Sequence, residues 1–130
     1  MVADFCNLAS VHSAAQEIAT LTDYIDVLIN NAGGIFNSFY RTTDGLEEAF
    51  QVNHLSPFLF TKKLLPLLEK SEESRIISVS SEAHKMGKID FDDLSAAKNF
   101  SGWRQYGATK MMNVLFAFRL HQLYQQKGIS

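Results

Sequence analysis

The chain has 130 residues, of which 46% are hydrophobic and 20% are charged, and its formal net charge is −2. This is the composition of one globular domain, and it excludes a disordered chain, a collagen-like chain and a low-complexity array. The near balance of acidic and basic residues also argues against a nucleic-acid-binding or polyanion-binding surface.

The sequence carries no sign of a membrane span, a secretory signal or a metal site. No run approaches the ~20 apolar residues that a membrane-spanning helix needs, and the N-terminus lacks a basic segment followed by an apolar one. The single cysteine, Cys6, cannot form an internal disulfide, which fits a reducing compartment. We therefore expect a cytoplasmic protein without a metal site, because no metal-ligand spacing links the four histidines, His12, His54, His84 and His121.

Apolar periodicity in the first third of the chain predicts a helix between two strands. Residues 1–8 are predicted to end a strand, and Ser10–Thr20 to form a helix with Ser10 as its N-cap. The β-branched run Ile25–Ile29 then predicts a buried strand. A loop of small residues, Asn30–Gly34, follows this strand.

The middle of the chain predicts a long helix and a second strand. Asp44 and Glu47 resemble a capping pair that opens a helix reaching Leu68, which Pro57 and Pro66 should bend or split. The run Arg75–Ser80 predicts the second strand.

A long polar connection and a last helix complete the pattern. The connection runs from Ser81 to Gln105 with a short turn near Phe91–Leu94, and segments of this length are usually functional. Apolar residues at helical spacing predict a helix from Tyr106 to about Gln126, and Gly128 is suited to end it.

Strands that alternate with helices predict an α/β fold with a parallel sheet and helices on both of its faces. The expected architecture is a partial doubly wound, Rossmann-like sheet. Residues 128–130 stand where a further strand would begin, and residues 1–8 read as the end of one. We therefore expect residues 1–130 to be the central part of a single domain that lacks its first strands and its C-terminal part, with an unpaired apolar edge at the first strand.

Tyr106 and Lys110 are the first candidates for chemistry. They lie four residues apart on the predicted last helix, so their side chains share one face about 6 Å apart along the axis. A cation placed there favours the phenolate form of a tyrosine, whose ordinary pKa is near 10. The same spacing also occurs in ordinary surface pairs on helices, so it does not decide between the two interpretations.

The ends of the two predicted strands are the second candidate. In a doubly wound sheet, ligands bind at the carboxyl ends of the strands, which here are Asn30–Gly34 and Ser78–Ser81. A serine hydroxyl there can orient a substrate oxygen, and glycine lets a flat ligand approach the backbone. The alternative is an ordinary turn and serines that satisfy loop amides.

Four runs in this order and spacing together resemble the short-chain dehydrogenase/reductase family: N-N-A-G (Asn30–Gly33), V-N-H-L (Val52–Leu55), I-S-V-S-S (Ile77–Ser81) and Y-G-A-T-K (Tyr106–Lys110). The stretches Asp44–Leu55 and Ser80–Leu94 are similar to the retinol-dehydrogenase-like branch, with the WW-domain-containing oxidoreductase as a close relative.

The resemblance implies an NAD- or NADP-dependent oxidoreductase acting on an alcohol or carbonyl of a retinoid, a steroid or another lipid-like molecule. Tyr106 would exchange a proton with the substrate oxygen while hydride passes to or from the nicotinamide. Ser81 would hydrogen-bond that oxygen, and Lys110 would lower the tyrosine pKa and hold the nicotinamide ribose. Asn53 would support a proton-relay water.

The resemblance also implies cofactor contacts beyond Tyr106 and Lys110. Asn30, Ala32 and Gly33 would line the adenosine and ribose side of the cofactor. Asn7 stands where the family usually has an aspartate that touches adenine, so it keeps a hydrogen-bonding group and loses the charge.

One expected element has no counterpart in these residues. The seven glycines form no glycine-rich phosphate loop, so the isolated chain is expected to bind nicotinamide nucleotide weakly or not at all. The residue that would choose between NAD and NADP is not recognisable either.

The alternative interpretation is a catalytically incomplete form that acts through protein–protein interaction. In the family, the helices that correspond to Asp44–Glu69 and Tyr106–Gln126 commonly form dimer contacts, which makes a homodimer of the full-length protein an expected partner. Relatives in the retinol branch are anchored at the endoplasmic reticulum by an N-terminal segment, so the full-length form is a candidate for that location.

Overall fold

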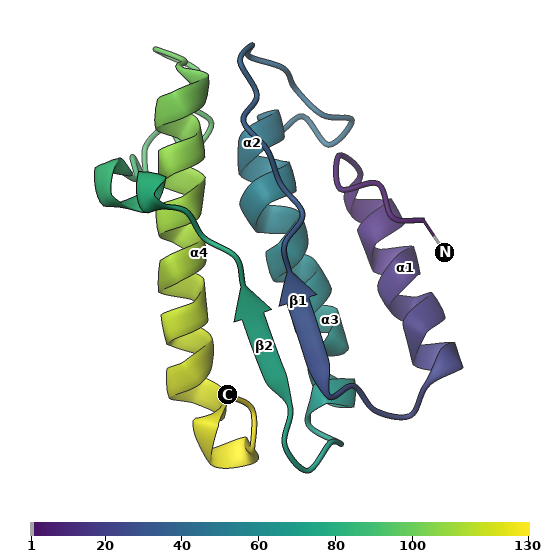
Figure 1. The fold of residues 1–130 in the computed structure, drawn as a ribbon. Helices are drawn as coiled ribbons and strands as arrows, with labels where there is room; N and C mark the ends of the chain where they lie inside the picture. Colours follow the sequence, from purple (N-terminus) through teal and green to yellow (C-terminus); the bar gives the residue numbers. More distant parts are fainter. Residues whose placement is uncertain (1) are drawn as a thin grey trace.

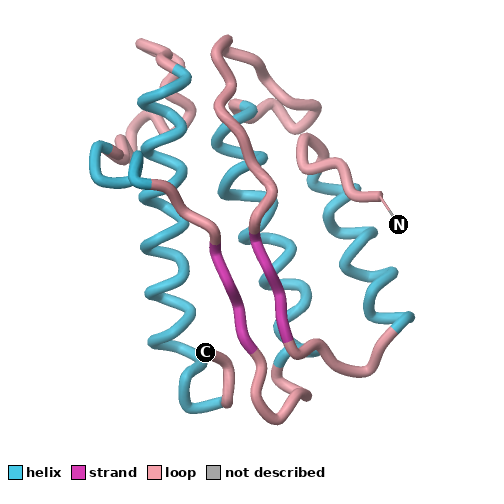
Figure 2. Tube along the Cα trace, in the orientation of Figure 1, coloured by secondary structure: helices cyan, strands magenta, loops and turns pink. Residues whose placement is uncertain are grey.

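Two short parallel strands, β1 (Val27–Asn30) and β2 (Arg75–Ser78), form the centre of the structure, a computed structural model that describes residues 2–130 (Figures 1 and 2). Val27 pairs with Arg75, and Asn30 pairs with Ser78 at the other end of the ladder. Both predicted strands and their parallel arrangement are confirmed.

The C-terminal residues lie beside β2, on the side away from β1. Ile129 forms a parallel bridge with Ser74, and the amide of Ile76 donates to the carbonyl oxygen of Ser130 at 2.9 Å. The predicted start of a further strand at residues 128–130 is thereby confirmed. Within residues 2–130, the other edge of the sheet, along β1, pairs with no strand, as expected.

The long helices all lie on one face of the sheet (Figure 1). The long ones are α1 (Leu8–Leu21), α3 (Ser56–Leu68) and α4 (Gly102–Tyr124). The core forms where these helices meet Leu28 and the C-terminal residues, and its buried members are Ala15, Leu28, Leu64, Leu67, Leu68 and Ile129.

The opposite face of the sheet is exposed. Because side chains alternate along a strand, Val27, Ile29 and Ile77 point away from the helices and are 49%, 58% and 45% exposed. The prediction of helices on both faces is therefore wrong for the described residues. In the run Ile25–Ile29, which was predicted to be a buried strand, Leu28 is the one buried residue.

The first helix begins earlier than predicted. Asn7 is its N-cap, with Oδ1 accepting from the amides of Ala9 at 3.0 Å and Ser10 at 3.2 Å. The hydroxyl of Ser10 instead accepts from the amide of Asp4. The predicted Ser10 cap and the predicted strand at residues 1–8 are therefore wrong, since residues 2–7 form no strand and Leu8 is already helical; Met1 lies outside the described residues.

The long central helix contains a wide turn. It runs through α2 (Glu48–Phe50), a π-helical turn η1 (Gln51–Leu55) and α3. The predicted interruption near Pro57 is this turn, in which the amide of Ser56 donates to the carbonyl oxygen of Gln51. Pro66, in contrast, lies inside α3 without splitting it.

The cap of the central helix is Glu47, whose carboxylate accepts from the amides of Ala49 and Phe50 at 2.8 Å each. The prediction that Asp44 caps this helix is wrong. Its Oδ2 accepts from the amide of Leu8 at 2.9 Å, which ties it to the start of α1.

Helix α4 starts four residues before the predicted position, so Tyr106 lies in its second turn. Its first residue packs closely on the loop after β1, because a Cβ on Gly102 would lie 2.1 Å from the carbonyl oxygen of Phe36. After α4, the short helix η3 (Gln125–Lys127) leads to Gly128, whose φ of 77° confirms the predicted stop.

The connection before α4 contains a 3₁₀ helix, η2 (Glu82–Met86), that the sequence pattern did not predict. Turns near Phe91–Leu94 are present as expected. Among the described residues, no helix combines the length and the apolar character that crossing a membrane requires.

Candidate active site

Tyr106 and Lys110 lie together on α4, as the spacing predicts. The Lys110 Nζ is 5.5 Å from the centroid of the Tyr106 ring. Lys110 is only 4% exposed, and its ammonium donates to the carbonyl oxygen of Val79, just after β2, at 3.1 Å. The lysine thus connects α4 to the carboxyl end of the sheet.

The ammonium of Lys110 is buried without an acidic partner among residues 2–130. It has three N–H donors and makes one hydrogen bond, to Val79, within the described part of the chain. A buried ammonium is costly unless its donors meet acceptors. A Cβ built on Gly33 would lie 3.8 Å from Nζ, so the loop after β1 passes close to this charge.

Asn53 joins that loop to the wide turn η1. Its Oδ1 accepts from the amide of Gly34 and its Nδ2 donates to the carbonyl oxygen of Gly34, both at 2.9 Å. Nδ2 also donates to the Thr109 hydroxyl, next to Lys110, at 3.2 Å. The structure therefore brings Asn53, the loop at Gly33 and Gly34, and Lys110 into one cluster.

Ser81 lies at the start of η2 and caps it. Its Oγ accepts from the amide of Ala83 at 3.2 Å. A serine hydroxyl has one hydrogen to donate as well as lone pairs that accept, so this bond leaves the hydrogen available for a substrate oxygen.

The segment that carries Ser81 packs closely on the turn of α4 that carries Tyr106. A Cβ on Gly87, which follows η2, would lie 2.3 Å from the carbonyl oxygen of Gly107, and a Cβ on Gly107 would lie 3.0 Å from that of Ala83. Only glycines allow this approach. Ser81 and Tyr106 therefore belong to segments in direct contact.

Two predicted cofactor residues, Asn30 and Asn7, make hydrogen bonds elsewhere in the structure. The Asn30 Nδ2 donates to the buried Thr61 hydroxyl on α3 at 2.8 Å, and Asn7 caps α1. Ala32 is exposed. No hydrogen bond in the described structure joins these residues to Tyr106 or Lys110, and their cofactor roles stay predictions.

The structure adds residues that the sequence analysis missed. The Trp103 ring stacks on Tyr106, with centroids 5.9 Å apart and planes at 30°. Gln105 donates to the fully buried Glu47 carboxylate at 2.8 Å and so ties the residue before Tyr106 to the start of α2. Trp103 is three residues before Tyr106, a spacing that signals contact on a helix, whereas nothing in the pattern pairs Gln105 with Glu47.

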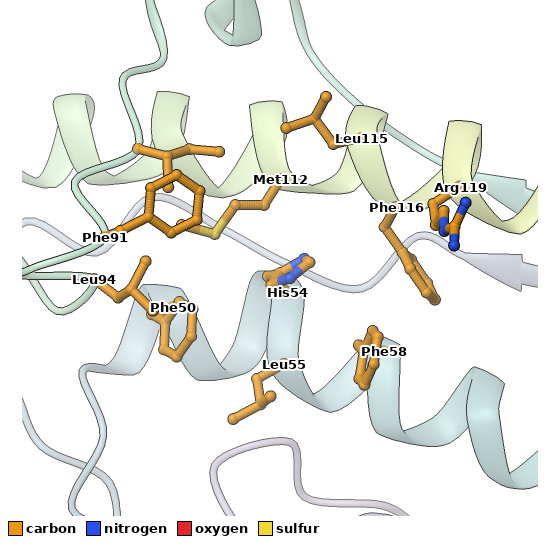
Figure 3. A pocket seen from close by; sticks show the side chains of 11 residues that line it. Phe50, His54, Leu55, Phe58, Phe91, Leu94, Met112, Leu115, Phe116 and Arg119 are labelled. Atoms are coloured by element: carbon orange, nitrogen blue, oxygen red, sulfur yellow. The ribbon is translucent and has the colours of Figure 1, made fainter.

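A separate apolar groove lies between the central helix and α4 (Figure 3). It has a volume of about 410 Å³, and neither Tyr106 nor Lys110 lines it. His54 stands in it between aromatic rings, with the Phe116 ring edge-on at 6.3 Å. The residues that line the apolar groove are Phe50, His54, Leu55, Phe58, Ile89, Phe91, Leu94, Met112, Leu115, Phe116 and Arg119.

The position of His54 predicts a pH dependence of stability. Burial lowers the pKa of His54 below its ordinary value of 6.5, against the opposing effect of its hydrogen bond with Asn113. In the unfolded chain this histidine takes up a proton near pH 6.5, while in the fold it stays neutral to lower pH. The free energy of unfolding should therefore fall as the pH drops from about 6.5 through the lowered pKa of the folded state.

Urea unfolding of the protein and of His54→Gln at about pH 7.5 and pH 5 measures this effect. The wild type should lose more stability than the variant over this interval. Equal losses in the two proteins would contradict the assignment to His54.

Comparisons with known sequences identify the family of the chain. The sequence profile of the short chain dehydrogenase family matches residues 1–130. Retinol dehydrogenase 14 of Mus musculus is 42% identical over 117 residues, which cover 90% of this chain and 35% of that protein. The resemblance to the WW-domain-containing oxidoreductase stays a prediction.

Solved structures share the fold. An uncharacterised protein from Mycobacterium paratuberculosis superposes with a TM-score of 0.86 at 34% identity, over 98% of this chain and 46% of that one. RhlG of Pseudomonas aeruginosa, in a complex with NADP, superposes with a TM-score of 0.75 at 26% identity, over 100% of this chain and 49% of that one. The chain thus spans about a third to a half of the length of these relatives, and along the whole of its own length it belongs to the short-chain dehydrogenase family, with retinol dehydrogenases among its relatives.

Proposed function

We propose that the protein uses this site to interconvert an alcohol and a carbonyl with NAD or NADP. The observation that carries the proposal is the buried Lys110 ammonium, which lies against the Tyr106 ring and beside the Gly33 backbone with one protein hydrogen bond in the described structure. Its other donors suit the hydroxyl groups of a ribose. The family and the NADP in the RhlG complex support a nicotinamide cofactor, in either its NAD or its NADP form.

The residues present fit such a cofactor on its nicotinamide side. The backbone at Gly33 is open beside Lys110 because this residue has no side chain. A Cβ there would lie 2.7 Å from the Asn53 Oδ1 and 3.8 Å from the Lys110 Nζ. Lys110 and the Gly33 backbone would hold the nicotinamide ribose, and the predicted contacts of Asn30 and Ala32 would extend toward the adenosine. When bound, the cofactor accepts or supplies the hydride.

The protein side chains would manage the proton. In the direction of oxidation, Tyr106 would take the proton from the substrate hydroxyl, and in reduction it would return a proton to the carbonyl oxygen. Ser81 donates its free hydrogen to the same substrate oxygen and holds it. Asn53 keeps the loop at Gly34 in place and would support the water that reprotonates the tyrosine.

The relatives and Trp103 support a lipid-like substrate class. The relatives include retinol dehydrogenases, and Trp103, which is 51% exposed, extends the Tyr106 ring into a larger aromatic surface. A retinoid, a steroid or another lipid-like alcohol suits such a surface. The test is turnover of retinol with NAD or NADP by the protein from its native source, and the absence of turnover with retinoid, steroid and simple alcohols alike would contradict the proposal.

The second candidate function is association with another copy of the chain. Two side chains that line the apolar groove are exposed, Phe58 on α3 by 37% and Leu115 on α4 by 51%, and Leu123, further along α4, is 50% exposed. The helices that carry them are those that the family resemblance implies in dimer contacts. If the protein is catalytically inactive, this surface is the basis for an interaction role.

A charge in the groove should prevent this association. Leu115→Glu is expected to convert a dimer into a monomer in light scattering, because the carboxylate would lose its hydration on an apolar interface. Leu21→Glu is the matched control, since Leu21 is 72% exposed at the end of α1 and outside the groove. A dimer that survives Leu115→Glu would exclude the groove as the interface.

A further inference from the structure

Asn113 is a buried polar residue that the proposed mechanism does not use. It lies on α4 one turn beyond Lys110 and is 8% exposed. Its Nδ2 donates to the carbonyl oxygen of Asn53 at 2.9 Å, and its other end lies 2.9 Å from the His54 Nδ1. With Nδ2 committed to Asn53, the Oδ1 of Asn113 is the acceptor for an N–H at the His54 Nδ1.

Pro57 removes one of the backbone donors that could serve the Asn53 carbonyl oxygen. In a regular α-helix, the oxygen of residue 53 accepts from the amide of residue 57, four positions further on. Proline has no N–H, so this bond cannot form. Asn53 is fully buried in the wide turn η1, so its carbonyl oxygen lies away from bulk solvent.

Asn113 therefore completes the set of hydrogen bonds around Asn53. Gly34 and Thr109 hold the Asn53 carboxamide, and Asn113 holds its main chain. Because Asn113 and Lys110 belong to the same helix, this contact also fixes the wide turn relative to the ammonium.

We propose that Asn113 is a positioning residue: it gives the Asn53 carbonyl the hydrogen bond that Pro57 cannot give, and it thereby sets Asn53 and the loop at Gly34 relative to Lys110. The inference deepens the proposed function, and its structural part stands without turnover. His54 takes up the remaining end of the Asn113 carboxamide, which links the apolar groove to the candidate active site.

Two measurements on the full-length protein and its variants test the proposal. They are the hydrogen-exchange rate of the Gly34 amide and kcat. The Gly34 amide donates to the Asn53 Oδ1, so its exchange reports on Asn53 directly. Asn113→Ala should speed this exchange by about tenfold and lower kcat by a similar factor, since a buried acceptor loses its partner. Asn113→Asp, which keeps the acceptor for His54 and removes the donor for Asn53, should act in the same way and serves if the alanine variant does not fold.

Pro57→Ala provides the rescue. An alanine restores the amide at position 57, so in this background Asn113→Ala should change the Gly34 exchange and kcat by much less than tenfold. Gln122→Ala, an exposed amide on the same helix, is the matched control and should change neither quantity.

Unchanged Gly34 exchange in both Asn113 variants, or an equal effect of Asn113→Ala with and without Pro57, would overturn the proposal. If every variant lacks turnover while the exchange pattern and its rescue appear, the positioning of Asn53 stands and the proposed function fails. The two failures are therefore distinguishable.

Discussion

Tyr106→Phe should lower kcat/KM by about 10²–10⁴-fold, the usual contribution of a positioned acid or base. The phenol oxygen is the group that would exchange the proton with the substrate. Its removal leaves the Trp103 and Lys110 contacts of the ring in place.

The fold should survive this change, because within residues 2–130 no hydrogen bond to the Tyr106 hydroxyl is lost. Circular dichroism and urea unfolding check that point beside the rate measurement. Tyr24→Phe is the matched control, since Tyr24 is exposed and lies between α1 and β1, away from the candidate active site. A Tyr106→Phe variant that keeps its rate within a few-fold would remove the tyrosine from the mechanism.

Gly87→Ala should lower the stability of the fold, because η2 and α4 approach each other closely at this residue. The new Cβ would lie 2.3 Å from the carbonyl oxygen of Gly107, 2.8 Å from its carbon and 2.9 Å from the Met111 Cβ. Overpacking of this kind costs about 1–3 kcal/mol or more, and backbone atoms cannot rotate away as a side chain can. We expect the midpoint of urea unfolding to fall accordingly.

The same variant should also lower turnover. To relieve the contact, η2 has to move away from α4, and this displaces Ser81 from Tyr106. Gly34→Ala is the control for stability, because its Cβ would meet only the end of the Phe36 ring at 3.8 Å. Equal stability of the Gly87 and Gly34 variants would show that the approach of η2 to α4 is looser than described.

The sequence predicted the features that depend on local pattern. The apolar runs at Ile25–Ile29 and Arg75–Ser80 overlap the strands β1 and β2. Tyr106 and Lys110 share a helix face as well, because these properties follow from side-chain period alone. The family resemblance added Ser81 and Asn53, which lie in segments that contact the same part of α4.

The sequence failed where tertiary contacts decide. Asp44 and Ser10 have the right chemistry for caps, but distant backbone amides or a neighbouring turn take up their oxygens, and Glu47 and Asn7 cap instead. Gly102, at the start of α4, lies against the backbone of Phe36, and no local pattern contains that contact.

The contacts of Asn113 and Gly87 are also tertiary contacts that no local pattern predicts. Each depends on the register between α4 and a segment far away in the chain. A glycine inside a helix, such as Gly107, is the one local signal of such an approach.

The central claim is that Ser81, Tyr106 and Lys110 act on one substrate oxygen beside a nicotinamide. A crystal structure of the protein with NADP and a ketone analogue of the substrate tests it most directly. We expect the ketone oxygen within hydrogen-bond distance of both the Ser81 Oγ and the Tyr106 hydroxyl, with the Lys110 Nζ on the ribose. A ketone oxygen bound far from either hydroxyl, or a ribose held away from Lys110, would contradict the account.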